Sequence, residues 1–393
     1  MKKKICYLSA IALVWLTAAC ALAGRNAENG VAENRQQPAA ETKSSDASGA
    51  GTEAAALTPR VGTLFRGSIG DAKVEMDIKR EGDALSGSYY YLKSGSANRL
   101  TLKGKVSGDG AFTMQESDAT GKQTGQFKGK WKLDPNEPGA SLEGQWLKPG
   151  QTGEGLGFYA YEQMVYFTTT EITTREIKET IKAKKAQISA EYPELSGSGA
   201  GVAGFNQLAK ARVTKSLADF KKDLAGVTAE DIKLMGEMGN YIDVGYDVEY
   251  ADDDLISVNF GEDTFTGGAH PNHDTFTLNY DLKQGRELKL ADLFKPGSKY
   301  LATIADYAVR DLKGRKDPES GENLGLAQDG FEDGAKPTAD NYRNWNVTKK
   351  GLLITFPPYQ VGAYAVGPQT VIVPYSQLKD NAVPDGPLSK ARP

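Results

Sequence analysis

The residues best suited to chemistry in this sequence are its two histidines, His270 and His273, which stand three positions apart. Three carboxylates lie near them in the chain, at Glu262, Asp263 and Asp274. Two imidazoles and one carboxylate can bind a zinc ion, so a metal site is one reading of this segment. A catalytic metal also needs an open coordination position, and no second histidine motif accompanies these residues. We therefore predict no metal and no cofactor.

Packing of a loop is the second reading of the same segment. Gly267 and Gly268 precede His270, and glycine readily adopts the positive φ of a tight loop, in which His270 would bind a backbone carbonyl. We take Gly267, Gly268, His270 and His273 as a candidate binding loop. Because two histidines leave few candidates for acid–base catalysis, we predict no catalytic residue and expect that the protein is not an enzyme.

The amino terminus has the pattern of an export signal. Three lysines follow Met1, an apolar run extends over Ile5–Leu16, and small residues precede Cys20. The run is too short for a permanent transmembrane helix and is typical of a secretory signal. Leu16–Cys20 resembles a bacterial lipobox, although Thr17 stands where leucine is usual. Because no cysteine follows Cys20, we predict that it is lipidated; the alternative is an ordinary signal peptide that contains a cysteine.

Charge and composition limit the partners. Cleavage before Cys20 leaves 374 residues and removes three lysines, which lowers the formal charge from −4 to −7. An exported acidic chain lacks the basic excess of a nucleic-acid binder, so no nucleic acid is expected. Residues 20–57 are polar and small without apolar periodicity, which predicts a solvated tether. We expect a protein of the cell envelope, anchored to a membrane through lipid on Cys20 and facing the periplasm from the outer membrane where the cell has two membranes.

Residues 58–166 predict an all-β domain. Runs with period-two alternation are separated by turns rich in glycine and aspartate, and the even spacing favours a small barrel over a sandwich. Trp131 and Trp146 fall on neighbouring strands, where they either fill the core or line a ligand mouth, so carriage of a small ligand stays an alternative. The predicted strands are Leu64–Ile69, Val74–Ile78, Leu85–Leu92, Leu100–Val106, Phe112–Glu116, Gln126–Leu133, Ser141–Trp146 and Gly155–Tyr161.

Beyond Phe167 the chain mixes helical and strand patterns, which predicts an α+β region. A polar, threonine-rich stretch leads to a predicted strand at Lys184–Tyr192, which Pro193 should end. Apolar residues from Phe205 to Leu224 recur at helical spacing and predict an amphipathic helix. The other predicted elements are a helix at Tyr300–Leu312 and strands at Tyr241–Tyr250, Leu255–Phe260, Leu352–Phe356 and Val371–Val373.

Several motifs follow one another in the C-terminal region. They are Thr266–Pro271, Phe276–Leu282, Gly285–Leu288, Leu290–Phe294, Phe356–Tyr359, Tyr364–Gly367 and Val371–Tyr375. In this order they resemble the paired extracellular domains shared by the peptidoglycan deacetylase PdaC and the lysozyme-sensing anti-sigma factor RsiV. The resemblance covers about Thr174 to Asp380 and leaves out the barrel-like domain.

This resemblance implies both a fold and a role. The expected fold class is α+β, with an N-terminal all-β small barrel or sandwich followed by an α+β PdaC/RsiV-like region. In RsiV-like proteins the paired domains bind lysozyme without catalysis, and in the deacetylase the chemistry belongs to a separate domain. We therefore expect a lipid-anchored cell-envelope binding protein that recognises lysozyme-type hydrolases or peptidoglycan. An enzyme that acts on peptidoglycan is the alternative from another class.

The predicted organisation has four segments: a signal peptide at 1–19, a lipidated flexible tether at 20–57, the barrel-like domain at 58–166 and the PdaC/RsiV-like region at 174–385. We expect the two folded units to be independent and to separate between Tyr161 and Glu176. Two further patterns predict no site. Gly199–Gly204 fits G-x-G-x-x-G but lacks a surrounding βαβ unit and predicts a flexible loop, and Asp252–Asp254 predicts a solvated turn between strands.

Overall fold

The computed structural model of the chain describes residues 63–135, 137–235 and 239–390. The predicted signal peptide, the predicted lipidation site Cys20 and the predicted tether lie outside the described residues. All described residues belong to one compact unit. Within them, no helix combines the length and the apolar composition that crossing a membrane requires.

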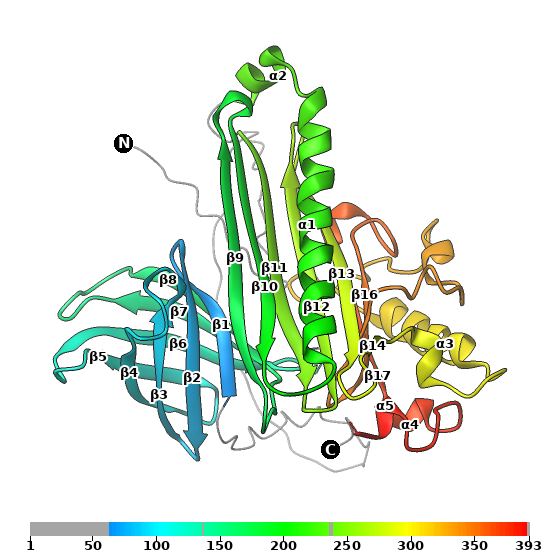
Figure 1. The fold of residues 1–393 in the computed structure, drawn as a ribbon, viewed down its shortest axis with the longest axis horizontal. Coiled ribbons are helices and arrows are strands. Elements are labelled where there is room, and N and C mark those ends of the chain that lie inside the picture. Colours follow the sequence, from blue (N-terminus) through cyan, green and yellow to red (C-terminus); the bar gives the residue numbers. More distant parts are fainter. Residues whose placement is uncertain (1–62, 136, 236–238, 391–393) are drawn as a thin grey trace, which may run out of the picture. The chain divides into compact units, whose positions relative to one another are not determined.

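The first part of the described chain is a closed barrel of eight antiparallel strands, as predicted (Figure 1). Each strand pairs with the next one in the chain, and β1 pairs with β8 to close the barrel. Where β6 meets β7, a Cβ on Gly129 would lie 2.0 Å from the carbonyl oxygen of Glu143, so only glycine fits this approach. The strands are β1 (Thr63–Ile69), β2 (Ala72–Glu81), β3 (Ala84–Tyr91), β4 (Leu100–Val106), β5 (Ala111–Ser117), β6 (Gln123–Leu133), β7 (Ala140–Leu147) and β8 (Leu156–Gln163).

Side chains fill the interior of the barrel. Trp131 is 5% exposed and meets Phe65 edge to face at 5.5 Å, which confirms core filling for this tryptophan. Trp146 lies at one end, where its Nε1 donates a hydrogen bond of 2.7 Å to the buried carboxylate of Glu116. The hydroxyl of Tyr89 donates to the same Oε2 atom at 2.6 Å. The two tryptophans therefore have different roles, one in the core and one in a polar network.

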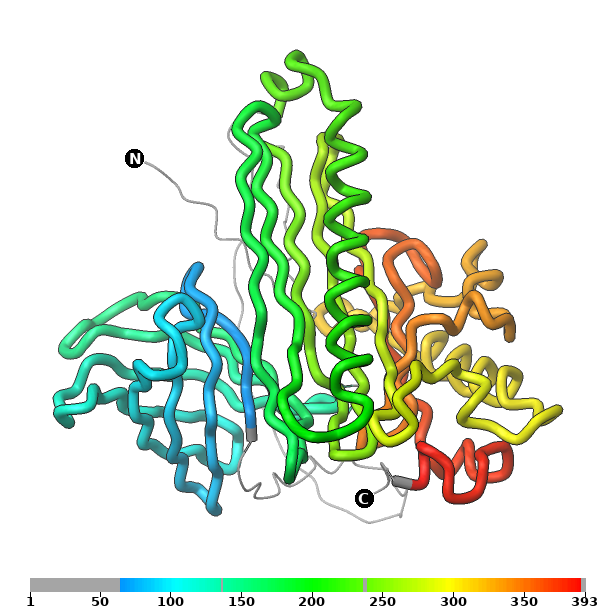
Figure 2. The backbone as a smooth tube through the Cα atoms, viewed as in Figure 1, coloured from blue at the N-terminus to red at the C-terminus, as the bar shows by residue number. Residues whose placement is uncertain are grey.

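The second part begins with a six-stranded sheet in the order β14-β13-β12-β11-β10-β9. All neighbouring strands are antiparallel except β10 and β11. A parallel pair needs a long crossover, and α1 provides it, lying along one face of the sheet (Figures 1 and 2). The elements are β9 (Glu171–Ile181), β10 (Ala186–Ser196), α1 (Val202–Gly226), α2 (Ala229–Leu234), β11 (Asn240–Ala251), β12 (Leu255–Phe265), β13 (Asn272–Asp281) and β14 (Arg286–Glu287).

Helix α1 forms because its apolar residues recur at a helical period and share one face. That face packs on β10–β13 and forms the core of this layer. Gly201 precedes α1, and a Cβ there would come within 2.3 Å of the carbonyl oxygen of Leu282, so the helix start packs closely against the end of β13. Gly204 lies in the first turn of the helix, so the loop predicted for 199–204 is wrong beyond Gly201. The buried residues of the helix are Val202, Phe205, Ala209, Val213, Leu217, Phe220 and Leu224.

Two sequence expectations fail at β9 and β10. The threonine-rich stretch forms strand β9, whose polar side chains are mostly exposed because β9 lies at the edge of the sheet. Pro193 does not end β10, which continues to Ser196 and pairs with β9 throughout. β11 pairs with β10 only from Ala186 to Ala190, so at Pro193 the only strand beside β10 is β9. On the side without a neighbour there is no backbone hydrogen bond for the missing N–H of Pro193 to break. The predicted turn at 252–254 is present between β11 and β12.

A three-stranded sheet, β15-β16-β17, and helix α3 form the last layer. Its core contains residues of α3 and of all three strands. Its elements are α3 (Tyr300–Gly314), β15 (Trp345–Val347), β16 (Gly351–Phe356), β17 (Gln369–Pro374), α4 (Tyr375–Leu378), α5 (Pro387–Lys390) and the 3-10 helices η3 (Leu290–Leu293), η4 (Glu332–Ala335) and η5 (Tyr364–Val366). Two further 3-10 helices lie earlier in the chain, η1 (Leu92–Ser94) between β3 and β4, and η2 (Lys182–Lys184) between β9 and β10.

Buried polar groups join the two sheets along a line that we call the polar seam, formed by Ser257, Asn279, Trp345 and Asn346. The hydroxyl of Ser257 donates to Asn279 Oδ1 at 2.5 Å and accepts from Asn346 Nδ2 at 3.0 Å. Asn279 Nδ2 donates to the carbonyl oxygen of Trp345 at 2.7 Å. Since buried polar groups are costly without partners, these bonds fix one arrangement of the two sheets.

Candidate binding site

The predicted binding loop forms the tip of the β12–β13 hairpin. Gly267 and Gly268 have φ values of 109° and 105°, a region that favours glycine, as the loop-packing reading predicts. A Cβ on Gly267 would lie 3.2 Å from the terminal methyl of Met235, just beyond α2. The hairpin tip therefore turns sharply, and the absence of a side chain at Gly267 leaves space for Met235.

His270 is held by contacts with the loop between β16 and β17. Its Nδ1 lies 2.7 Å from the carbonyl oxygen of Pro271, which confirms that this histidine binds a backbone carbonyl. Tyr364, in η5, donates its hydroxyl to the same carbonyl oxygen at 2.5 Å. The rings of His270 and Tyr364 stack, with centroids 3.9 Å apart. The hairpin tip is thus bound to a loop more than 90 residues later in the chain.

His273 faces Asp263 across the hairpin, since the two are cross-strand partners. Its Nδ1 forms a hydrogen bond with Asp263 Oδ1. This bond raises the pKa of His273, partial burial opposes the rise, and the charge of Asp263 adds to it. The His273 ring also lies 6.1 Å from the ring of Tyr364. His273 therefore keeps its positive charge to a higher pH than a free histidine does.

Tyr359 completes a surface that we call the aromatic platform, formed by His270, His273, Tyr359 and Tyr364. The side chain of Tyr359 is 60% exposed, and its ring lies 5.3 Å from that of Tyr364. Its φ of 70° is unusual for a residue with a side chain, and such strained backbone gathers at binding sites. An exposed, well-supported tyrosine is also the kind of residue that dominates protein interfaces.

The sequence predicted only part of this surface. Gly267, Gly268, His270 and His273 do come together, as one hairpin tip. The structure adds Tyr359 and Tyr364, which sequence reasoning had not placed in the site. Both residues belong to motifs that carry the family resemblance, Phe356–Tyr359 and Tyr364–Gly367. Membership of these motifs was the feature of the sequence that could have pointed to them. Among the described residues, no group of three or more His, Cys, Asp and Glu side chains is arranged to hold a metal ion.

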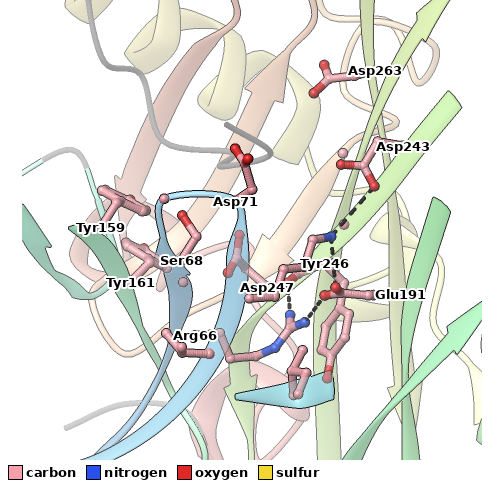
Figure 3. A pocket seen from close by; sticks show the side chains of 17 residues that line it. Arg66, Ser68, Asp71, Tyr159, Tyr161, Glu191, Asp243, Tyr246, Asp247 and Asp263 are labelled. Atoms are coloured by element: carbon pink, nitrogen blue, oxygen red, sulfur yellow. Dashed lines mark hydrogen bonds and ion pairs between the residues drawn. The ribbon is translucent and has the colours of Figure 1, made fainter. Parts of the chain in front are cut away.

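Asp263, which hydrogen-bonds His273 of the platform, also lines a cleft (Figure 3). Its volume is about 80 Å³. Barrel residues of β1, β2 and β8 form one side, and β10, β11 and β12 form the other. The residues with ionisable or hydroxyl side chains that line it are Arg66, Ser68, Asp71, Lys73, Tyr159, Tyr161, Glu191, Asp243, Tyr246, Asp247 and Asp263.

Two barrel cations enter this cleft and pair with acids of the sheet. Arg66 donates to Glu191 at 2.5 Å, and its guanidinium lies 3.6 Å above the ring of Tyr246. Lys73 lies 2.7 Å from Glu191 and 3.6 Å from Asp243. Burial alone would raise the pKa of Glu191, but the charges of Arg66 and Lys73 outweigh it and lower that pKa. Both cations are therefore already paired.

Burial dominates at two other acids of the cleft, Asp243 and Asp247. Burial raises the pKa of Asp243 although Lys73 lies beside it. Burial also raises the pKa of Asp247, with Arg66 and a hydrogen bond from Gln163 opposing the rise. For both acids the effect of burial therefore outweighs that of the nearby positive charge.

Comparisons with known proteins find similarities for two segments of the C-terminal half. Residues 179–273 match the family model of the deacetylase PdaC, and residues 291–376 match the family described as a protein of unknown function, DUF3298. These matches confirm the predicted resemblance to PdaC: one segment of the C-terminal half is similar to the PdaC family and the following segment to DUF3298. The aromatic platform takes His270 and His273 from the first and Tyr359 and Tyr364 from the second.

One curated relative is the peptidoglycan-N-acetylmuramic acid deacetylase PdaC of Bacillus subtilis strain 168. It is 26% identical over 166 residues, which cover 42% of this chain and 33% of the relative, so the match spans about a third of that protein. Two solved structures are also similar. A DUF3298 family member from Bacteroides fragilis NCTC 9343 has a TM-score of 0.42 and 21% identity, over 56% of this chain and 97% of that one. A DUF3298 family protein from Pseudomonas aeruginosa PAO1 has a TM-score of 0.38 and 15% identity, over 55% and 94%.

Proposed function

We propose that this protein is a lipid-anchored binding protein of the cell envelope and that its aromatic platform recognises a lysozyme-type hydrolase. The observation that carries this proposal is the platform itself, because the PdaC-like and DUF3298 domains each contribute two of its four rings. A surface assembled from two domains is available only when both are folded together. The likeness to a peptidoglycan deacetylase supports a role at the cell wall.

The chemistry of the platform suits a protein partner. Tyr359 offers a large, exposed ring supported by Tyr364, and such rings contribute much of the binding energy of interfaces. Lysozymes are commonly basic, whereas the mature chain has a formal charge of −7, so long-range attraction would speed their encounter. The known contacts of His270 and His273 hold the hairpin in place, which fits binding rather than catalysis.

Titration of the full chain with a basic lysozyme at low and at physiological salt tests the proposal. We expect saturable binding at physiological salt, and Tyr359→Ala should weaken it at least about tenfold, the effect of losing a central aromatic contact. Leu156→Ala is the matched control, because Leu156 is 51% exposed on the barrel, outside the platform. An unrelated basic protein controls for charge alone.

Each outcome decides the proposal. Binding of lysozyme that depends on Tyr359 supports it. Equal binding of lysozyme and the control protein would reduce it to nonspecific electrostatics, and absence of binding at physiological salt would refute the lysozyme assignment. Cosedimentation with insoluble peptidoglycan, followed by analysis of the released products, tests the two alternatives: retention without products would indicate a glycan-binding protein, and release of products would indicate an enzyme.

A further inference from the structure

Strand β9 leaves a long edge of the six-stranded sheet open. It has 11 residues and pairs only with β10, whereas β14 at the opposite edge has two residues (Figure 1). Along the outer edge of β9, no backbone–backbone hydrogen bond is formed within the described part of the chain. An exposed strand edge carries N–H and C=O groups that can bond a further strand. The side chains of β9 decide which strand fits.

The charges of β9 are arranged so that the strand is complementary to itself. Residues 174–180 read Thr-Arg-Glu-Ile-Lys-Glu-Thr, with Ile177 at the centre. In an antiparallel pair of two copies centred on Ile177, each residue faces the one that lies equally far beyond the centre in the other copy. The facing pairs are Glu176 with Lys178, Arg175 with Glu179, and Thr174 with Thr180, and each occurs twice. Opposite charges and paired threonines both stabilise neighbouring strands.

This register is distinguished from its neighbours by charge. Moving the centre half a residue toward the N-terminus places Arg175 opposite Lys178. Moving it half a residue the other way places Glu176 opposite Glu179, and a full residue brings two copies of Glu176 or of Lys178 together. Like charges directly opposite each other destabilise a strand pair. Charged side chains on an edge strand usually prevent association, whereas on β9 they prevent the wrong registers and allow one.

The charged side chains concerned are accessible to a second copy. The side chains of Arg175 and Lys178 are 56% and 60% exposed, and that of Glu179 is 43% exposed. Their present ion pairs, such as that between Lys178 and Glu176, are of the exposed kind that contributes little by itself. Glu176 and Lys178 share one face of β9, because they lie two residues apart. The second copy adds the reversed pair beside them, so four charges alternate in sign.

The barrel contacts β9 from the face of the sheet. The hydroxyl of Thr174 lies 3.4 Å from the Glu75 carboxylate of β2 and 2.8 Å from the hydroxyl of Tyr246. Tyr246 belongs to β11, two strands further into the sheet, so the Thr174 side chain lies over the face of the sheet. Among the described residues no barrel strand pairs with β9, because the barrel is closed on itself. The backbone groups of the β9 edge are thus available to a second copy.

We propose that β9 pairs with β9 of a second copy of this chain, antiparallel and centred on Ile177. The pairing joins the two six-stranded sheets into one continuous sheet and gives the assembly two aromatic platforms. It does not depend on what the platform binds. Because each copy contributes a single strand, the interface is small, and we expect a weak, reversible dimer.

Sedimentation equilibrium of the full chain, at concentrations from about 1 to about 300 µM, tests for this dimer. We expect a reversible monomer–dimer equilibrium with a Kd of about 10–100 µM. Glu176→Lys should raise the Kd at least about tenfold, because it places like charges opposite each other twice. Lys178→Glu should do the same. Lys313→Glu, exposed on α3, is the control for a change of net charge and should leave the Kd unchanged.

Mixing the two variants separates pairing from folding. When the Glu176→Lys chain pairs with the Lys178→Glu chain, both central contacts again join opposite charges. The mixture should therefore dimerise with a Kd within about threefold of that of the parent chain, although neither variant does so alone. A mixture that stays monomeric would overturn the proposal. So would a parent chain that is monomeric at the highest concentration, which would leave the edge to a strand of another protein, or a parent dimer that both variants leave unchanged.

Disulfide formation tests the register. In Ile177→Cys the two thiols belong to directly opposite residues, whose Cα atoms in an antiparallel pair are about 4.5–5.5 Å apart, within the range that a disulfide spans. Oxidation with copper phenanthroline should therefore give a covalent dimer. Thr173→Cys is the matched control, since its two copies would lie about 26 Å apart along the paired strands, and the native Cys6 and Cys20 are the same in both variants. Equal cross-linking of the two variants would show that the copies meet elsewhere and that the proposal is wrong.

Discussion

In the barrel, the buried carboxylate of Glu116 takes both of its hydrogen bonds from the same barrel, from Tyr89 and Trp146. In the C-terminal half, by contrast, the buried polar groups Ser257 and Asn279 bond across the polar seam to a second sheet. The bonds of Glu116 therefore stabilise one closed element, whereas the seam sets how two sheets meet. That matters for binding, because His270 and Tyr364 of the platform lie on opposite sides of the seam.

The strongest test of this contrast removes a core ring of the barrel. Phe127 is fully buried and contacts the rings of Tyr89 and Phe158. Phe127→Ala should destabilise the barrel by about 3–5 kcal/mol through loss of buried area and creation of a cavity. If the barrel and the C-terminal region fold independently, as the sequence predicts, calorimetry should show a lowered barrel transition with the C-terminal transition unchanged. Lys128→Ala, exposed on the same strand, is the control.

A single cooperative transition that shifts as a whole would contradict independent folding. The structure offers a route for such coupling, since Met164 and Tyr166, just after β8, form backbone hydrogen bonds with β11. Limited proteolysis separates the cases. Independent units should yield a resistant C-terminal fragment of about 210 residues after cleavage between Tyr161 and Glu176.

The next largest effect is expected at the seam. Asn279→Ala leaves the Ser257 hydroxyl and the Trp345 carbonyl without their partners, and each orphaned group costs about 1–3 kcal/mol. Urea unfolding should therefore show a loss of about 2–3 kcal/mol. Asn272→Ala, exposed on the same strand, should change stability by less than about 0.5 kcal/mol. If the contrast with the barrel is right, Asn279→Ala also weakens lysozyme binding. Unchanged binding would show that the seam does not position the platform.

A smaller, pH-dependent effect is expected where the barrel meets the C-terminal half. Burial raises the pKa of Glu137 from 4.5 to about 7, and the charges of Asp134 and Asp247 add to the rise, with Lys350 opposing it. Between these two pKa values the folded chain binds more protons at Glu137 than the unfolded chain does. The contribution of Glu137 to the free energy of unfolding is therefore complete below pH 4.5 and is lost as the pH rises through 7. Unfolding at pH 5 and pH 8 should show a fall of about 1–2 kcal/mol.

Glu137→Gln should remove this fall, because the amide does not ionise, and the variant should be the more stable protein at pH 8. Glu154→Gln, on an exposed loop of the barrel, should retain it. A pH profile of Glu137→Gln that is identical to that of the parent chain would show that other groups carry the dependence.

The smallest effect concerns one residue of the platform. The hydrogen bond with Asp263 raises the pKa of His273, so its imidazole should titrate above the usual value of 6.5 in an NMR experiment. Asp263→Asn should bring the pKa back toward 6.5, whereas Asp274→Asn, on the exposed end of β13, should change it less. A His273 pKa that does not change in Asp263→Asn would mean that His273 and Asp263 do not form their hydrogen bond in solution.

Local patterns in the sequence were sufficient for most elements. All eight barrel strands were predicted, because each pairs with its neighbour in the chain and alternates apolar and polar residues. The amphipathic helix α1 was also predicted from a local pattern, because its buried residues recur at helical spacing. β9 was missed because an edge strand with exposed polar side chains has no apolar alternation to detect. β10 was shortened because the effect of Pro193 depends on which side of the strand has a neighbour.

For the site, the sequence by itself determined the hairpin tip: Gly267 and Gly268 provide the positive φ that the turn requires, and His270 and His273 are local to it. Only the tertiary structure brought Tyr359 and Tyr364 to these histidines, and only it set Arg66 of the barrel against Glu191 of the sheet. The reason is physical. A turn is specified by the backbone preferences of adjacent residues, whereas contacts between distant segments depend on how complete layers pack and on the buried polar bonds that select one packing.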